Sequence, residues 1–574
     1  MAPSNKPPNP PSSTILELNS KSNPGDPFPL DTTTTSPLPK DATGRPTGTA
    51  NDYTDMHRLG RTQELRRTFR SLSVLGLAVT TMSSWVALLV TSRFSLINGG
   101  LAGSVWVFFA TWICTGTLVG SLAEMASMAP TSGGHIMKFG ERATVKGEEK
   151  EENISLTSQR IRYHWVSEFA PKSQQHFLSF LVGWLAALGW QALIATTAYA
   201  ASVLILALAA LYHPAYLPQN WHQSLLMIGI GCLGTLANTF GARKLPRLEY
   251  VVLAVHIVGF FCILIPLWVV RPLGEKASAG EVFGSFSNLG GWETLGTACY
   301  VGSITATGAF AGSDAAVHLA EETRDASRSV PRMMVGTVLL NGAMGFVMII
   351  TFAFCITDLD AVVSSESPFP FVDVFLSATG SRAGTVCMTL IPIILSVCTS
   401  LNAIAAASRQ AWALGRDQAL PFSPWFRKIV TIGTPIPLNS ILFSLTILII
   451  LALINIGSTA ALNTIIALLT SATSFSYALS ISCMLLKRLR GQPLPPARFS
   501  MGRYSVPVNV FAVGYIITAA VASFFPVSVP VDAVSMNWSV VVFGGVLCIA
   551  CVDYVFRGRK HYVAPVQHVE KEWD

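Results

Sequence analysis

The chain has 574 residues, of which 51% are hydrophobic and only 12% carry a charged side chain. A soluble globular chain carries about a quarter charged residues, so this composition excludes an ordinary water-soluble fold. The net charge is +7, but the basic residues lie in short loops, and the absence of a continuous basic face argues against a nucleic-acid partner.

The first 70 residues are rich in Pro, Ser, Thr and Asn and contain no apolar segment typical of a signal peptide. Such a composition cannot bury a core, so we expect residues 1–70 to form a disordered cytoplasmic tail. Residues 557–574 form the corresponding C-terminal tail.

Residues 71–556 contain apolar runs of about 20 residues, the length that a helix needs to cross the hydrocarbon core. They predict an all-α membrane protein with about twelve transmembrane helices. In chain order, we expect them at 71–92, 102–125, 177–211, 223–241, 249–270, 294–318, 332–356, 383–408, 438–456, 460–486, 508–526 and 537–556. The third is unusually long, so it either tilts or protrudes from the bilayer.

Lys and Arg gather in alternate loops, for example at 243–247, 324–332 and 487–490, whereas the loop at 357–381 is acidic. Cytoplasmic loops carry the excess of basic residues, which places the first set in the cytoplasm. Both termini are then cytoplasmic, as an even number of spans requires.

Two spans contain closely spaced glycines and small polar residues. The first has Gly76 followed by Thr80 and Ser83, and the sixth has Gly308 and Gly312 on either side of Phe310. One such glycine most often reflects close helix packing, but transporters also break helices at mid-membrane to expose backbone groups. Two interrupted spans five helices apart predict a five-plus-five inverted repeat, with the last two helices outside it.

Ionisable residues inside spans are costly and are therefore functional candidates. Asp314 lies in the second half of the sixth span, and Glu321, Glu322 and Arg324 follow near its cytoplasmic end. We interpret these four as an inner gate or a structural ion-pair network. His256 lies alone in the middle of the fifth span, where it is either a buried core residue or a proton carrier.

No nucleophile–base pair and no phosphate-binding loop occurs in the sequence, so we expect neither an enzyme nor an ATP-driven pump. The ten cysteines lie almost wholly within apolar runs. Cys548 and Cys551 form a CxxC without a second pair, and we interpret them as packing residues rather than as a zinc site. We therefore predict no metal and no cofactor.

Several segments resemble the fungal amino acid/choline permeases, which include γ-aminobutyrate permeases and belong to the amino acid–polyamine–organocation superfamily. The segments are SLAEMASMAPTSGG (121–134), YHWVSEFAP (163–171), GWLAALGWQ (183–191), GARKLPRLE (241–249), GSDAAVHLAEETRDASRSVPR (312–332) and SRQAWALGRDQALPFS (408–423). The resemblance implies broken helices 1 and 6, transport of γ-aminobutyrate, choline or other amino acids, and a plasma-membrane or organelle-membrane location.

The resemblance also implies a substrate site between the two broken helices. Its candidate contacts are Gly76, Thr80 and Ser83 in the first span and Phe310, Ala311 and Gly312 in the sixth. Half-helix N-termini would receive a substrate carboxylate, and the aromatic residues Trp85, Tyr300 and Phe310 would face an ammonium group. In some relatives a basic residue on helix 5 replaces a sodium ion, and His256 falls at about that place, which implies proton co-transport.

The chain departs from the family pattern at residues 135–162, where a highly charged segment separates two family motifs. It cannot cross lipid, so we expect a cytoplasmic loop, and it is either a genuine insertion or an artefact of the gene model. Two alternative functions also stay open, namely a choline-specific permease and a nutrient sensor that binds without transporting.

Overall fold

The computed structural model describes Thr49, Asp52, Asp55 and residues 71–564, apart from 131–160, 214, 242–243, 271–275, 365–369, 433, 458–460 and 533–535. Most of the N-terminal tail, nearly all of the charged segment at 135–162 and the last ten residues therefore lie outside the described part of the chain.

Twelve membrane spans occur close to the predicted positions. They are α2 (Ser71–Met82) with α3 (Ser84–Ile97), α4 (Gly100–Met128), α6 (Gln175–Tyr212), α7 (Asn220–Phe240), α8 (Leu245–Val269), α10 (Leu295–Ala309) with the 3₁₀ helix η3 (Ala315–Glu322), α11 (Ala326–Cys355), α14 (Arg382–Arg416), α16 (Leu438–Gly457), α17 (Ala461–Leu489), α18 (Ser505–Ala522) and α19 (Ser539–Asp553). Within the described residues, eleven of these spans are long and apolar enough to cross a membrane, and the twelfth is the broken pair α10 and η3. The prediction of an all-α membrane protein is thus confirmed.

Helix α6 has 38 residues, which corresponds to about 57 Å at 1.5 Å per residue. The hydrocarbon core is about 30 Å thick, so this helix extends well beyond it, in agreement with the long third span in the sequence.

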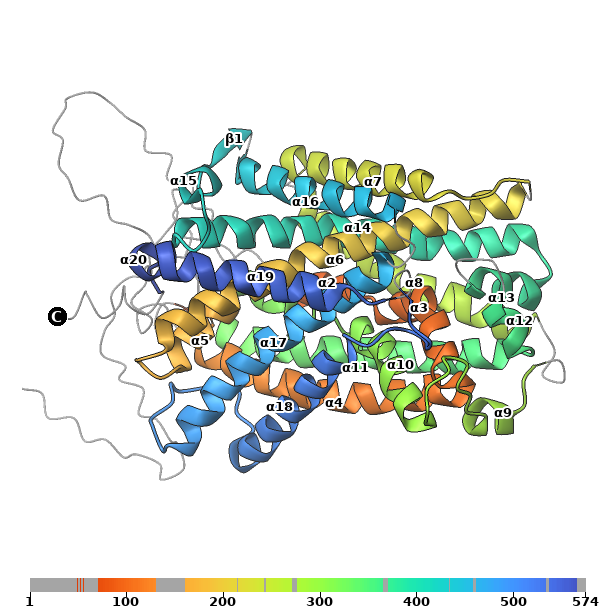
Figure 1. The fold of residues 1–574 in the computed structure, drawn as a ribbon, viewed down its shortest axis with the longest axis horizontal. Helices are drawn as coiled ribbons and strands as arrows, with labels where there is room; N and C mark the ends of the chain where they lie inside the picture. Colours follow the sequence, from red (N-terminus) through yellow and green to blue (C-terminus); the bar gives the residue numbers. More distant parts are fainter. Residues whose placement is uncertain are drawn as a thin grey trace, which may run out of the picture.

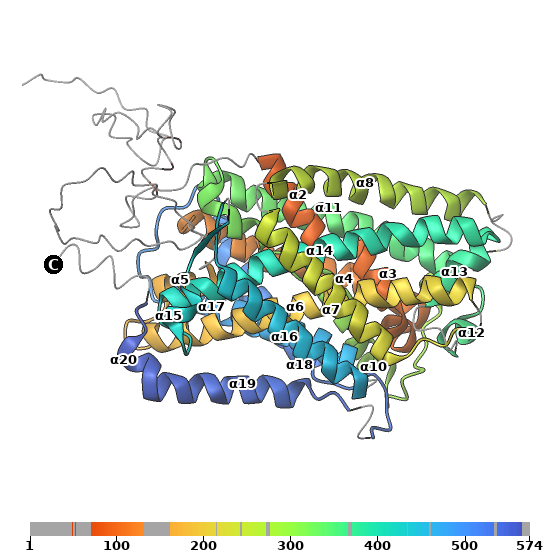
Figure 2. The same ribbon diagram turned by 90° about the horizontal axis from the view of Figure 1, so that it is seen from above.

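The broken first span lies at the centre of the molecule. In its most apolar window 78% of the residues are buried, against 17% for the last span. The last span, α19, lies along the outside of the bundle (Figure 2). Charged and broken segments in the middle of the bundle are therefore shielded from lipid by the surrounding helices.

Four closely packed pairs of spans are five apart in the chain. Helix α4 packs along α11, α6 along α14, α7 along α16, and α3 along α10. Successive spans cross in opposite directions, so partners five spans apart are antiparallel. This pairing agrees with the predicted five-plus-five inverted repeat and brings the two broken spans together.

Short elements cap the two ends of the bundle. One end carries α5 (Ile161–Phe169), α15 (Ser423–Phe426), the hairpin β1 (Val430–Ile432) and β2 (Thr434–Ile436), and α20 (Arg559–His561). The other end carries α9 (Ala279–Gly284), α12 (Leu359–Ser364) and α13 (Pro370–Thr379) (Figure 1). Two further short segments are η4 (Gly502–Tyr504) and the π-helical turn η5 (Tyr554–Gly558). The two strands of the hairpin are antiparallel, with Val430 paired with Ile436. The sequence did not predict these short elements.

Candidate functional site

The first span breaks at Ser83, between α2 and α3. Ser83 has φ 40° and ψ 49°, a left-handed conformation that residues other than glycine rarely adopt. Its backbone N–H donates to the Val79 carbonyl at 3.0 Å, and its hydroxyl donates to the Thr80 carbonyl at 2.6 Å. The helix axis is therefore interrupted while the last carbonyls of α2 stay hydrogen-bonded.

Side chains from two other spans complete the hydrogen bonding at this break. Asn341 on α11 accepts from the Ser84 N–H at 3.1 Å and donates to the Val79 carbonyl at 3.3 Å. Thr399 on α14 donates to the Thr80 carbonyl at 3.0 Å. Irregular backbone at membrane depth survives only where protein groups satisfy it, and these two side chains serve that role.

The sixth span breaks over residues 310–314, beside the first break. Gly312 has φ +82°, and a Cβ built on it would lie 3.2 Å from the Thr81 Cγ2. The Ser84 hydroxyl donates to the Ala309 carbonyl at 2.6 Å. The backbone N–H groups of Gly312 and Ser313 donate to no acceptor among the described residues. They are therefore available to a bound molecule.

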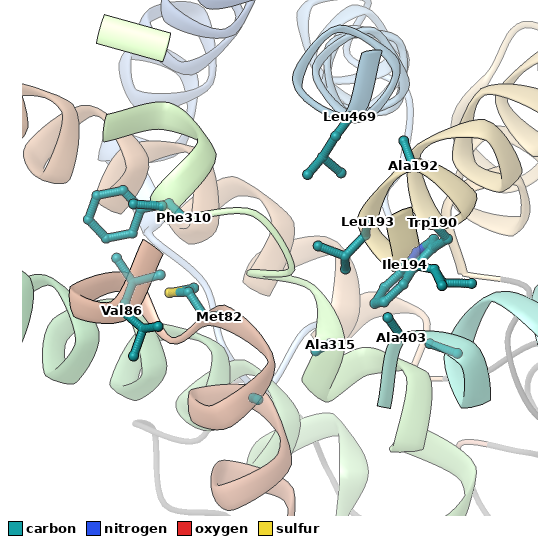
Figure 3. Close-up of a cluster of buried hydrophobic side chains, with 14 of the residues drawn as sticks. Met82, Val86, Trp190, Ala192, Leu193, Ile194, Phe310, Ala315, Ala403 and Leu469 are labelled. Atoms are coloured by element: carbon teal, nitrogen blue, oxygen red, sulfur yellow. The ribbon is translucent and has the colours of Figure 1, made fainter. Parts of the chain in front are cut away.

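A cavity of about 80 Å³ lies beside the two breaks, and side chains of five spans surround it. Figure 3 shows Met82 and Val86 on one side of this region and Leu193 on the other. Its polar lining consists of hydroxyl groups, from Thr81, Ser83, Thr91, Thr196, Thr197, Ser396 and Thr399. Within the described part of the chain, no charged or aromatic side chain lines it. The site is small and carries no fixed net charge.

Of the substrate contacts predicted in the first span, only Ser83 lines the cavity. Thr80 lies directly behind Ser83, with its carbonyl bonded to Ser83 and Thr399. Gly76 packs instead against α8, where an added Cβ would lie 3.4 Å from the Leu253 side chain. Trp85 also faces α8 and is fully buried there, so it does not line the cavity.

The predicted contacts of the sixth span are divided in the same way. Ala311 lines the cavity, and Gly312 forms the turn beside it. The Phe310 ring points away from Leu193 and Leu469 (Figure 3) and stacks on Phe108, with ring centroids 5.3 Å apart.

Tyr300 lies nearer the other end of α10, away from the breaks. Its hydroxyl donates to the Thr518 carbonyl of α18 at 2.6 Å. In this conformation, none of the three predicted aromatic residues lines the cavity.

The predicted gate residues lie on both sides of η3. Asp314 is fully buried, accepts a hydrogen bond of 2.8 Å from the Tyr477 hydroxyl, and lies 3.5 Å from the His318 ring nitrogen. Arg324 is exposed. Glu321 and Glu322 belong to η3, but their side chains lie outside the described part of the structure.

His256 is fully buried on α8, next to the first broken span. Its ring lies 5.7 Å from the Trp85 ring, centroid to centroid. Neither ring nitrogen has a hydrogen-bond partner among the described residues. His256 therefore contacts Trp85, two residues after the break at Ser83, but it does not line the cavity.

Three polar residues at the site were missed by sequence reasoning. Asn341 and Thr399 looked like ordinary small polar residues of apolar spans, and nothing local marks them as partners of the break. Glu249 is buried, with only 2% of its surface exposed, and it accepts a hydrogen bond of 3.1 Å from the Thr80 hydroxyl. The sequence did contain a sign of Glu249. The predicted span began at residue 249, which left this carboxylate at its edge, whereas α8 begins at Leu245 and carries Glu249 within the helix.

The broken spans, the cavity beside them and the repeat define the architecture of a multi-pass membrane transporter. The chain matches the family profile described as "Amino acid permease" over residues 158–547, and it belongs to that family. Known members are named permeases and transporters, which identifies the chain as a transporter rather than an enzyme.

Individual relatives cover nearly the whole chain. The chain is 29% identical to Amino-acid permease 2 of Neurospora crassa, over 90% of this chain and 89% of that protein. It is 25% identical to the Choline transporter of Saccharomyces cerevisiae, over 87% of this chain and 83% of that one. These names support secondary transport of amino acids or choline.

A solved structure shares the fold. It is that of the Eremococcus coleocola manganese transporter, which is 12% identical to the chain, with a TM-score of 0.50 and coverage of 87% of this chain and 95% of that one.

Proposed function

We propose that this protein carries a small zwitterionic amino acid, of the γ-aminobutyrate type, in preference to a quaternary amine. The observation behind this choice is the lining of the cavity, which combines hydroxyl groups with no aromatic side chain in the described structure. Quaternary ammonium ligands are recognised by aromatic faces. A zwitterion instead needs donors for its carboxylate and oxygen acceptors for its ammonium group.

The carboxylate of such a substrate would bind the free N–H groups of Gly312 and Ser313, at the start of the half-helix η3. Exposed N–H groups at a half-helix N-terminus attract anions. Ser83, Thr196 and Ser396 line the cavity next to this turn, and their hydroxyl groups would accept hydrogen bonds from the ammonium group.

Transport would proceed by alternating access, driven by proton co-transport, with the protein in the plasma membrane and both termini in the cytoplasm. Two buried titratable side chains of α8, Glu249 and His256, lie next to the broken first span. The sequence predicts His256 as the proton carrier, and a group of this kind beside a movable half-helix supports proton coupling.

The test is uptake of labelled γ-aminobutyrate and labelled choline, side by side, in cells that lack their own permeases, at acidic and neutral external pH. We expect γ-aminobutyrate uptake that rises at acidic pH and little choline uptake. Choline uptake that γ-aminobutyrate does not inhibit would overturn the substrate assignment. Binding without uptake, with the protein present at the cell surface, would point to the sensor alternative.

A further inference from the structure

Glu249 is a buried carboxylate without a counter-charge. It is 2% exposed, and its oxygens lie within 4 Å of no Lys, Arg or His nitrogen among the described residues. Burying an isolated carboxylate in its ionised form costs far more than burying its neutral form. A group of this kind therefore either binds a proton or awaits a cation.

The Thr80 hydroxyl offers Glu249 two consistent hydrogen-bond patterns. Its oxygen lies 3.1 Å from Glu249 Oε2 and 2.9 Å from the Gly76 carbonyl, but a hydroxyl has only one hydrogen to donate. With an ionised Glu249, the Thr80 hydroxyl donates to the carboxylate. With a protonated Glu249, the carboxyl O–H donates to Thr80 Oγ1 and the Thr80 hydroxyl donates to the Gly76 carbonyl.

This switch is connected to the cavity through the break of the first span. The Thr80 carbonyl accepts hydrogen bonds from Ser83 and Thr399, and both of these residues line the cavity. The Asn402 side chain, one turn beyond Thr399 on α14, faces Glu249. Its Nδ2 reaches no acceptor with ordinary geometry in the described structure. Glu249 therefore lies where α2, α8 and α14 meet.

Other titratable groups on the elements packed against α8 do not neutralise Glu249. Helix α2 carries none, and the Cys398 thiol of α14 is the one close to Glu249. His256 follows Glu249 by seven residues, about 10 Å along the helix axis. The exposed charged side chains of these elements are Lys244, next to α8, Arg247 on α8, Arg328 and Arg332 on α11, Asp373 on α13 and Arg382 on α14, and Arg409 and Arg416 on α14 are half-buried.

We propose that Glu249 binds the proton that is co-transported with the substrate. The inference rests on the proposed proton coupling and assigns the proton to Glu249 instead of His256. The proton adds to Glu249 Oε2 when the site is open to the proton-rich side and leaves after the site opens to the other side. When Glu249 is ionised, the Thr80 hydroxyl donates to its carboxylate and no longer to the Gly76 carbonyl. The charge state of Glu249 therefore changes the hydrogen bonding of α2 immediately before its break.

The test combines substrate uptake with proton entry, measured with an intracellular pH indicator, in Glu249→Gln. Glutamine keeps the size and polarity of the protonated acid but cannot release a proton. We expect substrate-induced proton entry to vanish and the pH dependence of uptake to flatten, while exchange of labelled for unlabelled substrate continues. Glu281→Gln, on the exposed helix α9, is the control for loss of an acidic group. Glu249→Asp should restore part of the proton entry.

The outcomes separate this inference from the proposed function. If wild-type uptake depends on protons and Glu249→Gln keeps full proton entry, the assignment to Glu249 is overturned and His256→Gln becomes the decisive variant. If the wild type shows no proton entry, proton coupling itself fails, and this inference fails with it. A Glu249→Gln protein that still exchanges substrate shows that lost proton entry does not result from misfolding.

Discussion

At the scale of single residues, the side chain of Asn341 holds the broken first span in place. It is fully buried on α11 and contacts backbone groups on both sides of Ser83, the Val79 carbonyl and the Ser84 N–H. A helix cannot supply these contacts itself once its axis is interrupted. The break therefore depends on a side chain from another span.

Replacing Asn341 with Ala should lower substrate uptake at least about tenfold at equal surface expression. Each buried polar group left without a partner costs about 1–3 kcal/mol, and about 1.4 kcal/mol corresponds to a factor of ten. Surface-normalised uptake measures the effect. Thr446→Ala, on the exposed side of α16, is the matched control, and equal uptake by the two variants would contradict this role of Asn341.

The proton-carrier role predicted for His256 is tested by His256→Ala. If His256 carried the proton, this variant would flatten the pH dependence of uptake and leave the protein at the membrane. From the isolation of the His256 ring nitrogens and the contacts of Glu249, we expect instead that pH dependence persists. Loss of pH dependence in His256→Ala together with its retention in Glu249→Gln would restore the original prediction.

At the scale of elements, the two broken spans form one unit. Gly312 of the sixth span lies against Thr81 of the first, and Ser84 bonds to the Ala309 carbonyl. Helix α2 is also in contact with η3, so we expect the two broken spans to move together. Alternating access requires such coupling between the two halves of the site.

Substitutions at Gly312 should disrupt this unit. A left-handed conformation costs a residue with a side chain about 1–2 kcal/mol, so Gly312→Ala should lower uptake about tenfold. Gly312→Val, with a β-branched side chain close to Thr81, should abolish it. Gly229→Ala on α7, where nothing lies within 4 Å of the added Cβ, should leave uptake unchanged. Wild-type substrate affinity in Gly312→Val would rule out the broken-helix site.

At the scale of the whole molecule, an ion pair joins distant spans at one end of the bundle. Glu124 of α4 is fully buried and pairs with Arg488 of α17 at 3.1 Å. Ser505 at the start of α18 donates to the same carboxylate at 2.8 Å. These contacts link α17 and α18, the tenth and eleventh spans, to the second span, so the eleventh span is anchored to the repeat.

Arg488→Ala should lower the unfolding midpoint of the purified protein by several degrees. Removing Arg488, whose side chain is 17% exposed, leaves the fully buried Glu124 carboxylate uncompensated. Breaking a fully buried ion pair costs about 3–5 kcal/mol, so we expect a cost at the lower end of that range. The double variant Glu124→Gln/Arg488→Met should recover most of the loss, because neither charge then remains. An unfolding midpoint equal to that of the wild type in Arg488→Ala would contradict this account.

The predicted orientation is a further property of the whole molecule. The basic helix α20, the last described helix, lies at the same end of the bundle as α15 (Figure 1). We expect epitope tags on either terminus to be inaccessible to antibodies in intact cells and accessible after permeabilisation. Labelling of a terminus in intact cells would reverse the predicted orientation.

The positions of the spans and the two breaks were predictable from the sequence, because the length of an apolar run and its glycine content are local properties. The residues that serve the breaks were less predictable. Thr80 and Glu249 are hydrogen-bonded although 169 residues separate them in the chain, and no local pattern indicates such a pair.

The sequence by itself determined the class of protein, the number of spans and the pairing of a broken first span with a broken sixth one. Only the tertiary structure decided that Ser83 and Ala311 line the cavity, that Trp85 and Phe310 face away from it, and that Glu249 meets Thr80. The physical reason is that hydrophobicity selects membrane-spanning segments one by one, whereas the direction of each side chain depends on how the helices pack.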